Sequence, residues 1–395
     1  MNLWNPLTPR YKVDPYPLYD QLRNESPIYK AQTGEWIVTG YNEVKTILIN
    51  KNFGSGNRKL WIERSVDYLQ NKNIDISHVK DAINTFVLQL DPPSHTRIRK
   101  FMVENWSKAG VEDIINDNIN GVLSKIQENT VDLVQEYTSL LPTRNIVRIL
   151  GITTTDYDEL HRLCQEMIKA LDLYVSLREL VTLDKSSKAF IDFFKFRIEQ
   201  NNFEQGLART YINENEKLNE PLTNEELTSL LIFLFVAAEE TSVSFMSLSL
   251  YHIIQNGLID EFRDSYTINH KLEELLRYDS PVQLLGRIAL KDEIIGGVKI
   301  NKGETTTLSI GGANRDPAQF KNPNTINLTR NPKHLSFGQG IHYCLGDWLA
   351  KLTASRAIPA FLNNFKSISI NSEPANWYDN LAIRGFNNLK VTVKS

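Results

Sequence analysis

One cysteine of the chain has neighbours that could keep its sulfur deprotonated. Cys344 lies in residues 337–346, where three glycines let the backbone approach a flat cofactor closely. From Leu345 onward the apolar residues repeat at helical spacing, so we expect Cys344 at the N-terminus of a helix, whose partial positive charge favours the thiolate. A cysteine held in this way is a strong ligand for iron. The alternative is a buried, inert cysteine, which is our interpretation of Cys164.

Two adjacent glutamates interrupt an apolar helix in the middle of the chain. Residues 230–238 are apolar, and Glu239, Glu240 and Thr241 follow them. Burying two carboxylates is costly, so we expect one of them to face water. The functional interpretation places Glu240 and Thr241 beside a bound ligand, where an acid and an alcohol can hold water and move protons. The hydroxyl of Thr241 can also bond to a backbone carbonyl one turn back and loosen the helix.

Charged residues at helical spacing form two further candidate pairs. His95 and Arg99 are four residues apart and share one helix face, where they could bind the carboxylates of a ligand or lie on a solvated surface. Glu274 and Arg277 are three residues apart on a predicted helix and could form an ion pair. When exposed, such a pair stabilises a helix by only ~0.2–0.5 kcal/mol.

Residues 337–346 contain the pattern F-G-x-G-x-H-x-C-x-G without a departure, and in this the chain resembles the cytochrome P450 family. The resemblance covers essentially the whole chain, and it implies a haem b whose iron takes Cys344 as its axial ligand. Thiolate ligation favours O–O cleavage. The residues that the resemblance places against the haem are Cys344, Phe337, Gly338 and Gly346 on the cysteine side, Ala237 and Ala238 on the oxygen side, and His95, Arg99, Arg287 and His342 at the propionates.

The resemblance also assigns roles away from the cysteine. Glu240 and Thr241 match the acid and alcohol of the family's [AG]-G-x-[DE]-T, with Ala238 at the usual glycine, where its methyl is expected to narrow the oxygen groove. The family's E-x-x-R is a structural pair that locks with an arginine of the segment before the cysteine loop. The structural residues are therefore Glu274, Arg277 and Arg315, with Arg330 in the same downstream segment. The residues expected in the substrate pocket are Phe86, Val87, Phe233, Leu284, Leu285 and Phe386.

The implied reaction inserts one atom of O₂ into an apolar small molecule, by hydroxylation or epoxidation. A terpenoid, a fatty acyl chain or a polyketide fits the apolar pocket residues, either free or bound to a carrier protein. No G-x-G-x-x-G follows a predicted strand, so NAD(P)H is expected to act through a reductase and a separate ferredoxin or flavodoxin. Candidate lysines for docking that carrier are Lys100, Lys108, Lys333 and Lys351.

Other functions of a haem-thiolate protein stay open. The chain could be a peroxide-driven or isomerising enzyme that does not activate O₂, or a gas sensor or redox carrier. The pair Glu240–Thr241 disfavours these alternatives, because a protein that does not activate O₂ has no need of proton delivery.

Composition narrows the class of protein. Among 395 residues, 41% are hydrophobic, and 44 Lys and Arg against 47 Asp and Glu give a net charge of −3, which does not support nucleic-acid binding. The chain has two cysteines, which exclude a disulfide framework and fit a reducing compartment. No signal peptide is visible, and the longest apolar run is half the ~20 residues of a membrane-spanning helix. We expect a cytoplasmic monomer that has no membrane segment.

Periodicity predicts one mostly α domain over residues 1–395, with small peripheral β-sheets (α+β). By resemblance this is the cytochrome P450 fold, with a long central helix over the haem. That helix is predicted at residues 223–256, with Thr223 and Glu226 as a capping box. The other predicted elements are a strand at 35–39, a helix at 41–49, an irregular stretch at 51–80, a helix at 131–150, a hairpin at 293–300 and a C-terminal hairpin that contains residues 384–386.

Overall fold

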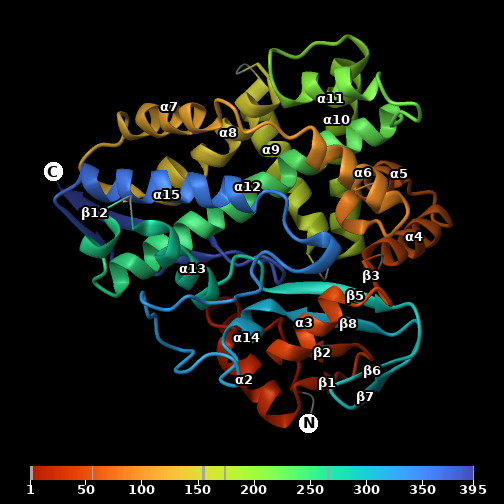
Figure 1. Cartoon of the computed structure of the whole chain (residues 1–395), viewed down its shortest axis with the longest axis horizontal. Coiled ribbons are helices and arrows are strands. Elements are labelled where there is room, and N and C mark those ends of the chain that lie inside the picture. Colours follow the sequence, from red (N-terminus) through yellow and green to blue (C-terminus); the bar gives the residue numbers. More distant parts are fainter. Residues whose placement is uncertain are drawn as a thin grey trace. The chain divides into compact units, whose positions relative to one another are not determined.

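The computed structural model describes residues 3–55, 57–84, 86–153, 156–172, 175–264 and 267–394. The chain is mostly α with small β-sheets, as predicted (Figure 1). Its internal contacts form two compact units, each discontinuous in sequence. Unit 1 comprises Met1–Gly54, Ile119–Leu141 and Thr241–Ser395, and unit 2 comprises Ser55–Asn118 and Pro142–Glu240.

The main sheet belongs to unit 1 and has five strands in the order β1-β2-β8-β5-β3. Only β2 and β8 run parallel to each other, and the remaining neighbours are antiparallel. One face of this sheet packs on α3, whose Val44 and Ile47 are buried with Leu308 of β8. The strands are β1 (Ile28–Lys30), β2 (Trp36–Val38), β3 (Phe53–Gly54), β5 (Leu284–Ala289) and β8 (Thr305–Ser309).

Three smaller sheets complete the strands of unit 1. The hairpin β6–β7 confirms the one predicted at residues 293–300, and its turn residues Gly296 and Gly297 have φ of +52° and +79°, which suits glycine. The remaining strands are β4 (Asn129–Asp132), β6 (Glu293–Ile295), β7 (Val298–Ile300), β9 (Ser367–Ile370), β10 (Asn376–Trp377), β11 (Phe386–Asn388) and β12 (Lys390–Lys394).

The α-helices are distributed over both units. Those within unit 1 are α1 (Pro9–Val13), α2 (Tyr16–Glu25), α3 (Tyr41–Ile49), α13 (Ile268–Tyr278), α14 (Ile310–Asn314) and α15 (Asp347–Asn364). Those within unit 2 are α4 (Asn57–Gln70), α5 (Ser77–Asn84), α6 (Ser94–Glu104), α9 (Tyr157–Met167), α10 (Leu177–Glu199) and α11 (Leu207–Asn215). Three helices have residues in both units: α7 (Val111–Leu123), α8 (Leu140–Leu150) and α12 (Asn224–Gln255).

Helix α12 confirms the long helix predicted at residues 223–256. Its capping box is formed, since the Thr223 hydroxyl accepts from the Glu226 amide at 3.2 Å and the Glu226 carboxylate accepts from the Thr223 amide at 2.9 Å. By length and composition α12 could span a membrane, but 72% of its most apolar stretch is buried inside the protein. It therefore packs as a core helix.

Two predictions of secondary structure were wrong. Residues 51–80, predicted as irregular, contain α4 and the first half of α5; Ile62, Val66 and Leu69 are buried on one face of α4. The helix predicted at 131–150 begins only at α8. Val131 pairs instead with Val391 of β12, and a π-helical turn at Val134–Thr138 follows, so sheet pairing overrides the helical spacing there.

Candidate active site

The loop before α15 gives Cys344 a fixed backbone and a partly accessible sulfur. The amide of Cys344 donates to the Phe337 carbonyl at 3.0 Å, and α15 begins three residues later. Gly338 and Gly340 have φ of +68° and +76°, which favours glycine, and a Cβ at Gly340 would lie 2.6 Å from the Leu48 carbonyl oxygen. The loop therefore takes this path only with glycine at position 340, and it presents a half-buried Cys344.

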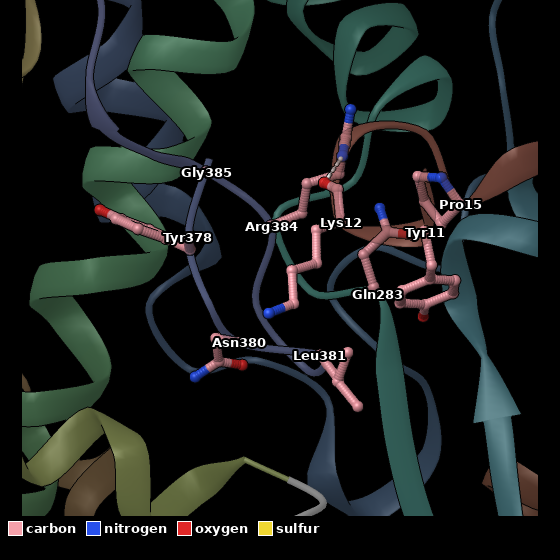
Figure 2. A pocket seen from close by; sticks show the side chains of 9 residues that line it. All are labelled: Tyr11, Lys12, Pro15, Gln283, Tyr378, Asn380, Leu381, Arg384 and Gly385. Atoms are coloured by element: carbon pink, nitrogen blue, oxygen red, sulfur yellow. Dashed lines mark hydrogen bonds between the residues drawn. The ribbon is translucent and has the colours of Figure 1, made fainter. Parts of the chain in front are cut away.

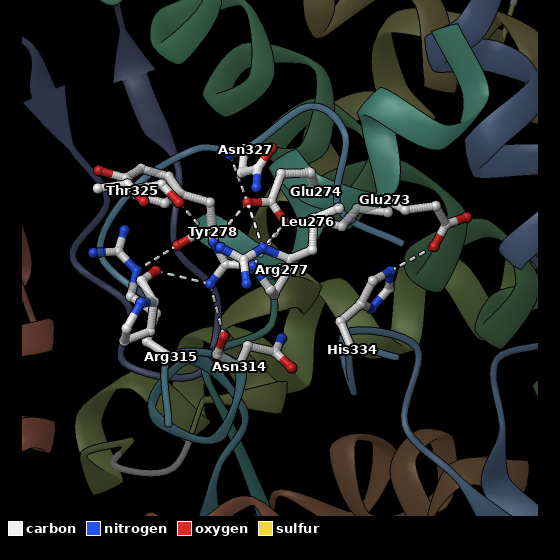
Figure 3. A network of polar contacts seen from close by, with 12 residues as sticks. Glu273, Glu274, Leu276, Arg277, Tyr278, Asn314, Arg315, Thr325, Asn327 and His334 are labelled. Carbon is white, nitrogen blue, oxygen red and sulfur yellow. Dashed lines mark hydrogen bonds and ion pairs between the residues drawn. The ribbon is translucent and has the colours of Figure 1, made fainter. Parts of the chain in front are cut away.

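Phe337 of the same loop is in contact with two polar side chains of unit 1. The His334 ring centroid lies 5.9 Å from that of Phe337, and the Lys351 ammonium lies 4.9 Å from it. Both side chains bond to Glu273, at 2.6 Å and 2.7 Å; Figure 3 shows the His334 bond. Burial opposes ionisation of Glu273, but the bonds from His334 and Lys351 outweigh it and lower its pKa to about 2. Helix α13 thus anchors the cysteine loop through an ion-paired carboxylate.

Cys164 lies in a different environment. It is buried on α9, and its burial, followed by the nearby charge of Glu239, raises the pKa of its thiol well above the usual value. A thiol in such surroundings stays protonated and is a poor iron ligand. Of the two cysteines, Cys344 is the one with a partly accessible sulfur.

Helix α12 has one partly accessible face in its middle part. Between Leu227 and Leu250 every residue is buried except five, which recur at intervals of about one turn. These residues are Phe233, Ala237, Ala238, Thr241 and Ser242. The helix remains continuous through this stretch. Ala237, Ala238 and Thr241, which the sequence assigned to the oxygen side, are among these five. Phe233, which it assigned to the substrate pocket, is another.

The prediction that Glu239 or Glu240 faces water was wrong. Both are buried, with 0% and 3% exposure. Each carboxylate is stabilised by a polar side chain of α9: His161 bonds to Glu239 at 2.5 Å and Gln165 to Glu240 at 2.9 Å. These hydrogen bonds offset the cost of removing the two carboxylates from water. Sequence reasoning missed both, because no motif marks His161 or Gln165.

The four predicted propionate partners divide between the units. In unit 2, His95 and Arg99 lie one turn apart on α6, and burial, followed by the charge of Arg99, lowers the pKa of His95. In unit 1, Arg287 is buried on β5, and His342 lies two residues before Cys344. Imidazole and guanidinium groups are suitable donors for carboxylates.

The E-x-x-R pair is fully buried in unit 1, and it is no exposed surface pair (Figure 3). Both bonds from Arg277 to Glu274 are 2.8 Å long, and Arg277 also donates to the carbonyls of Asn314, Pro323 and Thr325. The downstream arginine that reaches Glu274 is Arg330, at 3.1 Å.

Arg315 has other partners. Its Nε donates to the Tyr278 carbonyl at 2.7 Å, and its guanidinium lies 3.5 Å and 3.8 Å from the ring centroids of Tyr16 and Tyr278. Arg315 therefore braces the C-terminal end of α13, and Arg330 completes the E-x-x-R pair.

The candidate substrate-pocket residues differ in their surroundings. In unit 2, the rings of Phe86 and Phe233 are in contact at 5.5 Å between centroids, and Val87 is buried next to Phe86. In unit 1, Leu284 is buried and Leu285 packs against the core beside the main sheet. Phe386 is fully buried, with centroid distances of 4.1 Å to Trp377 and 5.2 Å to Tyr251. Phe386 is thus part of an aromatic core cluster.

A cavity elsewhere in unit 1 contains none of the predicted site residues (Figure 2). Arg384 lies on its wall and donates to Asp279 at 2.9 Å and to the Val13 carbonyl at 2.8 Å. Its charged groups are therefore already used in the fold. The lining residues are Tyr11, Lys12, Pro15, Gln283, Tyr378, Asn380, Leu381, Arg384 and Gly385.

The chemistry of these residues fits a haem. Cys344 offers one soft ligand, a sulfur that is partly accessible, in a loop rich in glycine. No group of three or more His, Cys, Asp or Glu that could hold a metal ion occurs in the described ranges. A porphyrin supplies four ligands itself and needs from the protein an axial sulfur and partners for two carboxylates, and residues of both kinds are present.

Comparison with known proteins agrees with this chemistry. The family model described as "Cytochrome P450" matches residues 267–384. The chain is 31% identical to the biotin biosynthesis cytochrome P450 of Bacillus subtilis over 90% of both chains. It is 29% identical to 6-deoxyerythronolide B hydroxylase of Saccharopolyspora erythraea over 96% of both. The crystal structure of P450BioI in complex with an acyl carrier protein superposes with a TM-score of 0.88 at 29% identity, covering 98% of this chain and 99% of that one. This chain belongs to the cytochrome P450 family, the haem b monooxygenases that use O₂ and electrons from NAD(P)H.

Proposed function

We propose that this cytochrome P450 hydroxylates or epoxidises an apolar acyl or polyketide substrate, with Cys344 as the axial ligand of its iron. The observation that carries the proposal is the loop of Cys344. Its path depends on glycine at positions 338 and 340, it precedes α15 directly, and α13 anchors it through Glu273. The haem, when bound, supplies the dioxygen chemistry. Every residue from 1 to 395 belongs to a single haem-binding domain in this proposal.

In this proposal the residues around the haem have separate roles in binding it. Phe337, Gly338 and Gly346 shape the sulfur side, and Ala237 and Ala238 leave room on the accessible face of α12. The methyl of Ala238, in place of the usual glycine, narrows that room. When haem is bound, its propionates would be held by His95, Arg99, Arg287 and His342, each of which can donate hydrogen bonds. Burial favours a neutral His95, which can still donate one hydrogen bond.

Thr241 and Glu240 form the catalytic pair. Thr241 lies on the accessible face of α12, where its hydroxyl can hold a water molecule. Glu240 is buried beside it and bonded to Gln165, so its carboxyl group can exchange a proton without being open to bulk water. We expect Glu240 to pass a proton to the water molecule that Thr241 holds.

The kind of substrate is inferred from apolar surroundings and from the relatives. The residues expected in the substrate pocket, Phe86, Val87, Phe233, Leu284 and Leu285, are all apolar and carry no charge. One similar structure is described as P450BioI in complex with an acyl carrier protein that carries hexadec-9Z-enoic acid, and another relative is described as the polyketide biosynthesis cytochrome P450 PksS. We expect a substrate of this type, tethered to a carrier protein or free.

Electrons reach the enzyme from separate proteins in the cytoplasm. A ferredoxin or flavodoxin receives them from an NAD(P)H-dependent reductase and docks on the side of the cysteine loop. The monomer needs no membrane or nucleic acid for this exchange.

The test uses the holoenzyme with a surrogate ferredoxin, its reductase and NADPH. Thr241→Ala and Glu240→Gln should each lower product formed per NADPH by about tenfold or more and raise the release of hydrogen peroxide, because proton delivery is lost. Ser247→Ala, which removes a buried hydroxyl from the same helix, should leave both ratios unchanged. Wild-type ratios in both catalytic variants would contradict the proposed pair. Product formed from peroxide alone at the full rate would place the enzyme among the peroxide-driven members.

A further inference from the structure

Helix α9 presents two polar side chains, one turn apart, to the two adjacent carboxylates of α12. The Nδ1 of His161 lies 2.5 Å from Oε1 of Glu239, and Gln165 donates from Nε2 to Oε2 of Glu240 at 2.9 Å. The spacing of four residues on α9 places both groups on the same face. The hydroxyl of Thr143 on α8 also donates to Glu239, at 2.9 Å. All these contacts lie within unit 2.

The two carboxylates have partners of different kinds. Glu239 has an ionisable partner, and Glu240 has a neutral amide. The His161 side chain is 29% exposed while that of Glu239 is fully buried, so His161 can exchange protons with solvent. The hydrogen bond to Glu239 is the largest cause that raises the pKa of His161, against its burial. An imidazolium at this place compensates a buried carboxylate that would otherwise be costly.

The remaining charged and titratable groups around His161 come from three helices. Asp158 and Tyr157 lie on α9 itself, with the Tyr157 ring stacked at 6.3 Å, and Cys164 lies one turn on. Glu240 on α12 adds a second negative charge. On α8, the guanidinium of Arg144 lies 5.3 Å from the Tyr157 ring centroid and adds a positive charge near this stack. The surroundings of His161 thus favour its charged form.

We propose that His161 and Gln165 are positioning residues of the reaction, His161 by cancelling the charge of Glu239 and Gln165 by fixing the carboxyl group of Glu240. This inference rests on the proposed role of Glu240. With the charge of Glu239 compensated by His161, Glu240 remains as the acid next to Thr241 that takes up and releases a proton. Without the imidazolium, a second negative charge one residue away would hold a proton on Glu240 and hinder its release.

A double-mutant cycle tests the proposal. The variants are His161→Gln, Glu239→Gln and the double variant, and the readout is peroxide released per NADPH consumed from pH 6 to pH 9. The holoenzyme is assayed with surrogate ferredoxin, its reductase and hexadec-9Z-enoic acid. His161→Gln keeps a hydrogen-bond donor but leaves Glu239 charged, so at pH values below the pKa of His161 its peroxide release should exceed that of wild type about threefold to tenfold. At the same pH values Glu239→Gln and the double variant should stay within about twofold of wild type, because neither leaves an uncompensated carboxylate at position 239.

The pH profile separates this role from a merely structural one. In wild type, peroxide release should increase as the pH rises through the pKa of His161, and this dependence should be absent from all three variants. Arg162→Gln is the matched control, since Arg162 lies on α9 but pairs with Glu159 at the surface. A profile that His161→Gln leaves unchanged overturns the proposal. So does a Glu239→Gln variant that releases as much peroxide as His161→Gln.

A second readout needs no turnover. In holoenzyme with ¹³C-labelled histidine, the NMR titration midpoint of His161 should lie above the ordinary value of ~6.5 and move down in Glu239→Gln. An unchanged midpoint overturns the pairing. Glu240→Gln, assayed beside the cycle, distinguishes the two levels: if it behaves as wild type, the catalytic pair itself is wrong, and if it alone is impaired, only the present inference is wrong.

Discussion

Glu273 is the residue through which α13 holds the cysteine loop. Its carboxylate bonds to His334 and Lys351, and both of these contact Phe337. Its pKa of about 2 lies below that of a glutamate in the unfolded chain, so the ionised carboxylate stabilises the folded state. Stability from this group is therefore complete above pH ~4.5 and is lost as the pH falls toward ~2.

Substitution Glu273→Gln should lower the free energy of unfolding by about 2 kcal/mol at pH 7, after allowance for its partial exposure. Urea unfolding measured from pH 7 down to pH 3 checks this, and the difference from wild type should shrink at the acid end. Glu304→Gln is the control, because Glu304 also has a pKa of about 2 but pairs with Lys30 and Trp36, away from the loop. Only Glu273→Gln should also weaken haem retention. A difference that stays constant with pH would contradict the ion pair.

At the scale of elements, the cysteine loop depends on how closely its backbone approaches α3. Gly340 is in the left-handed region, and a Cβ there would lie 2.6 Å from the Leu48 carbonyl oxygen and 3.3 Å from the Cα of Ile49. Neither contact can be relieved by a side-chain rotation, because both atoms are backbone. Alanine at this position would have to displace the loop that carries Cys344.

Gly340→Ala should therefore lose haem and fold stability together. Gly303→Ala is the matched control, since Gly303 has a similar φ of +86° but no atom within 4 Å of an added Cβ. Both variants carry the backbone strain of about 1–2 kcal/mol, and only Gly340→Ala adds the clash. Haem content per protein and melting temperature measure the effect. Equal haem content in the two variants would show that the approach to α3 does not set the loop.

The helices and turns that could be predicted are specified by residues close together in the sequence. Helix α3, the capping box of α12 and the glycine turn at residues 296–297 follow from neighbouring residues, and the ten residues around Cys344 carried the family. Strand β4 was not predictable, because Val131 joins a strand near residue 391. The burial of both Glu239 and Glu240 also depends on partners some 75 residues away on α9. Likewise Arg330 was no better marked than Arg315 as the partner of Glu274.

At the scale of the whole molecule, the chain holds the chemistry for oxygen insertion but no motif for binding a flavin or nicotinamide. In the proposed function, electrons come from a separate carrier that docks on the surface of this chain. Lys351 bonds to Glu273 and is partly covered, whereas Lys333 is exposed. Attraction of an acidic carrier to such lysines would be screened by salt.

NADPH oxidation should require both the surrogate ferredoxin and its reductase. Charge reversal of Lys100, Lys108, Lys333 and Lys351 together should slow electron transfer at low ionic strength and reduce its salt dependence, because the attraction is removed. Stopped-flow reduction of the holoenzyme at several salt concentrations measures this. Rates and salt dependence that match wild type would exclude these lysines as the docking surface.

The carbon monoxide spectrum of the reduced protein tests the central role of Cys344 most directly. Wild type and Cys164→Ala should show the strongly red-shifted band of a thiolate-bound haem, and Cys344→Ala should lose it. A red-shifted band that persists in Cys344→Ala, or that disappears in Cys164→Ala while the fold is retained, would contradict ligation of the iron by Cys344.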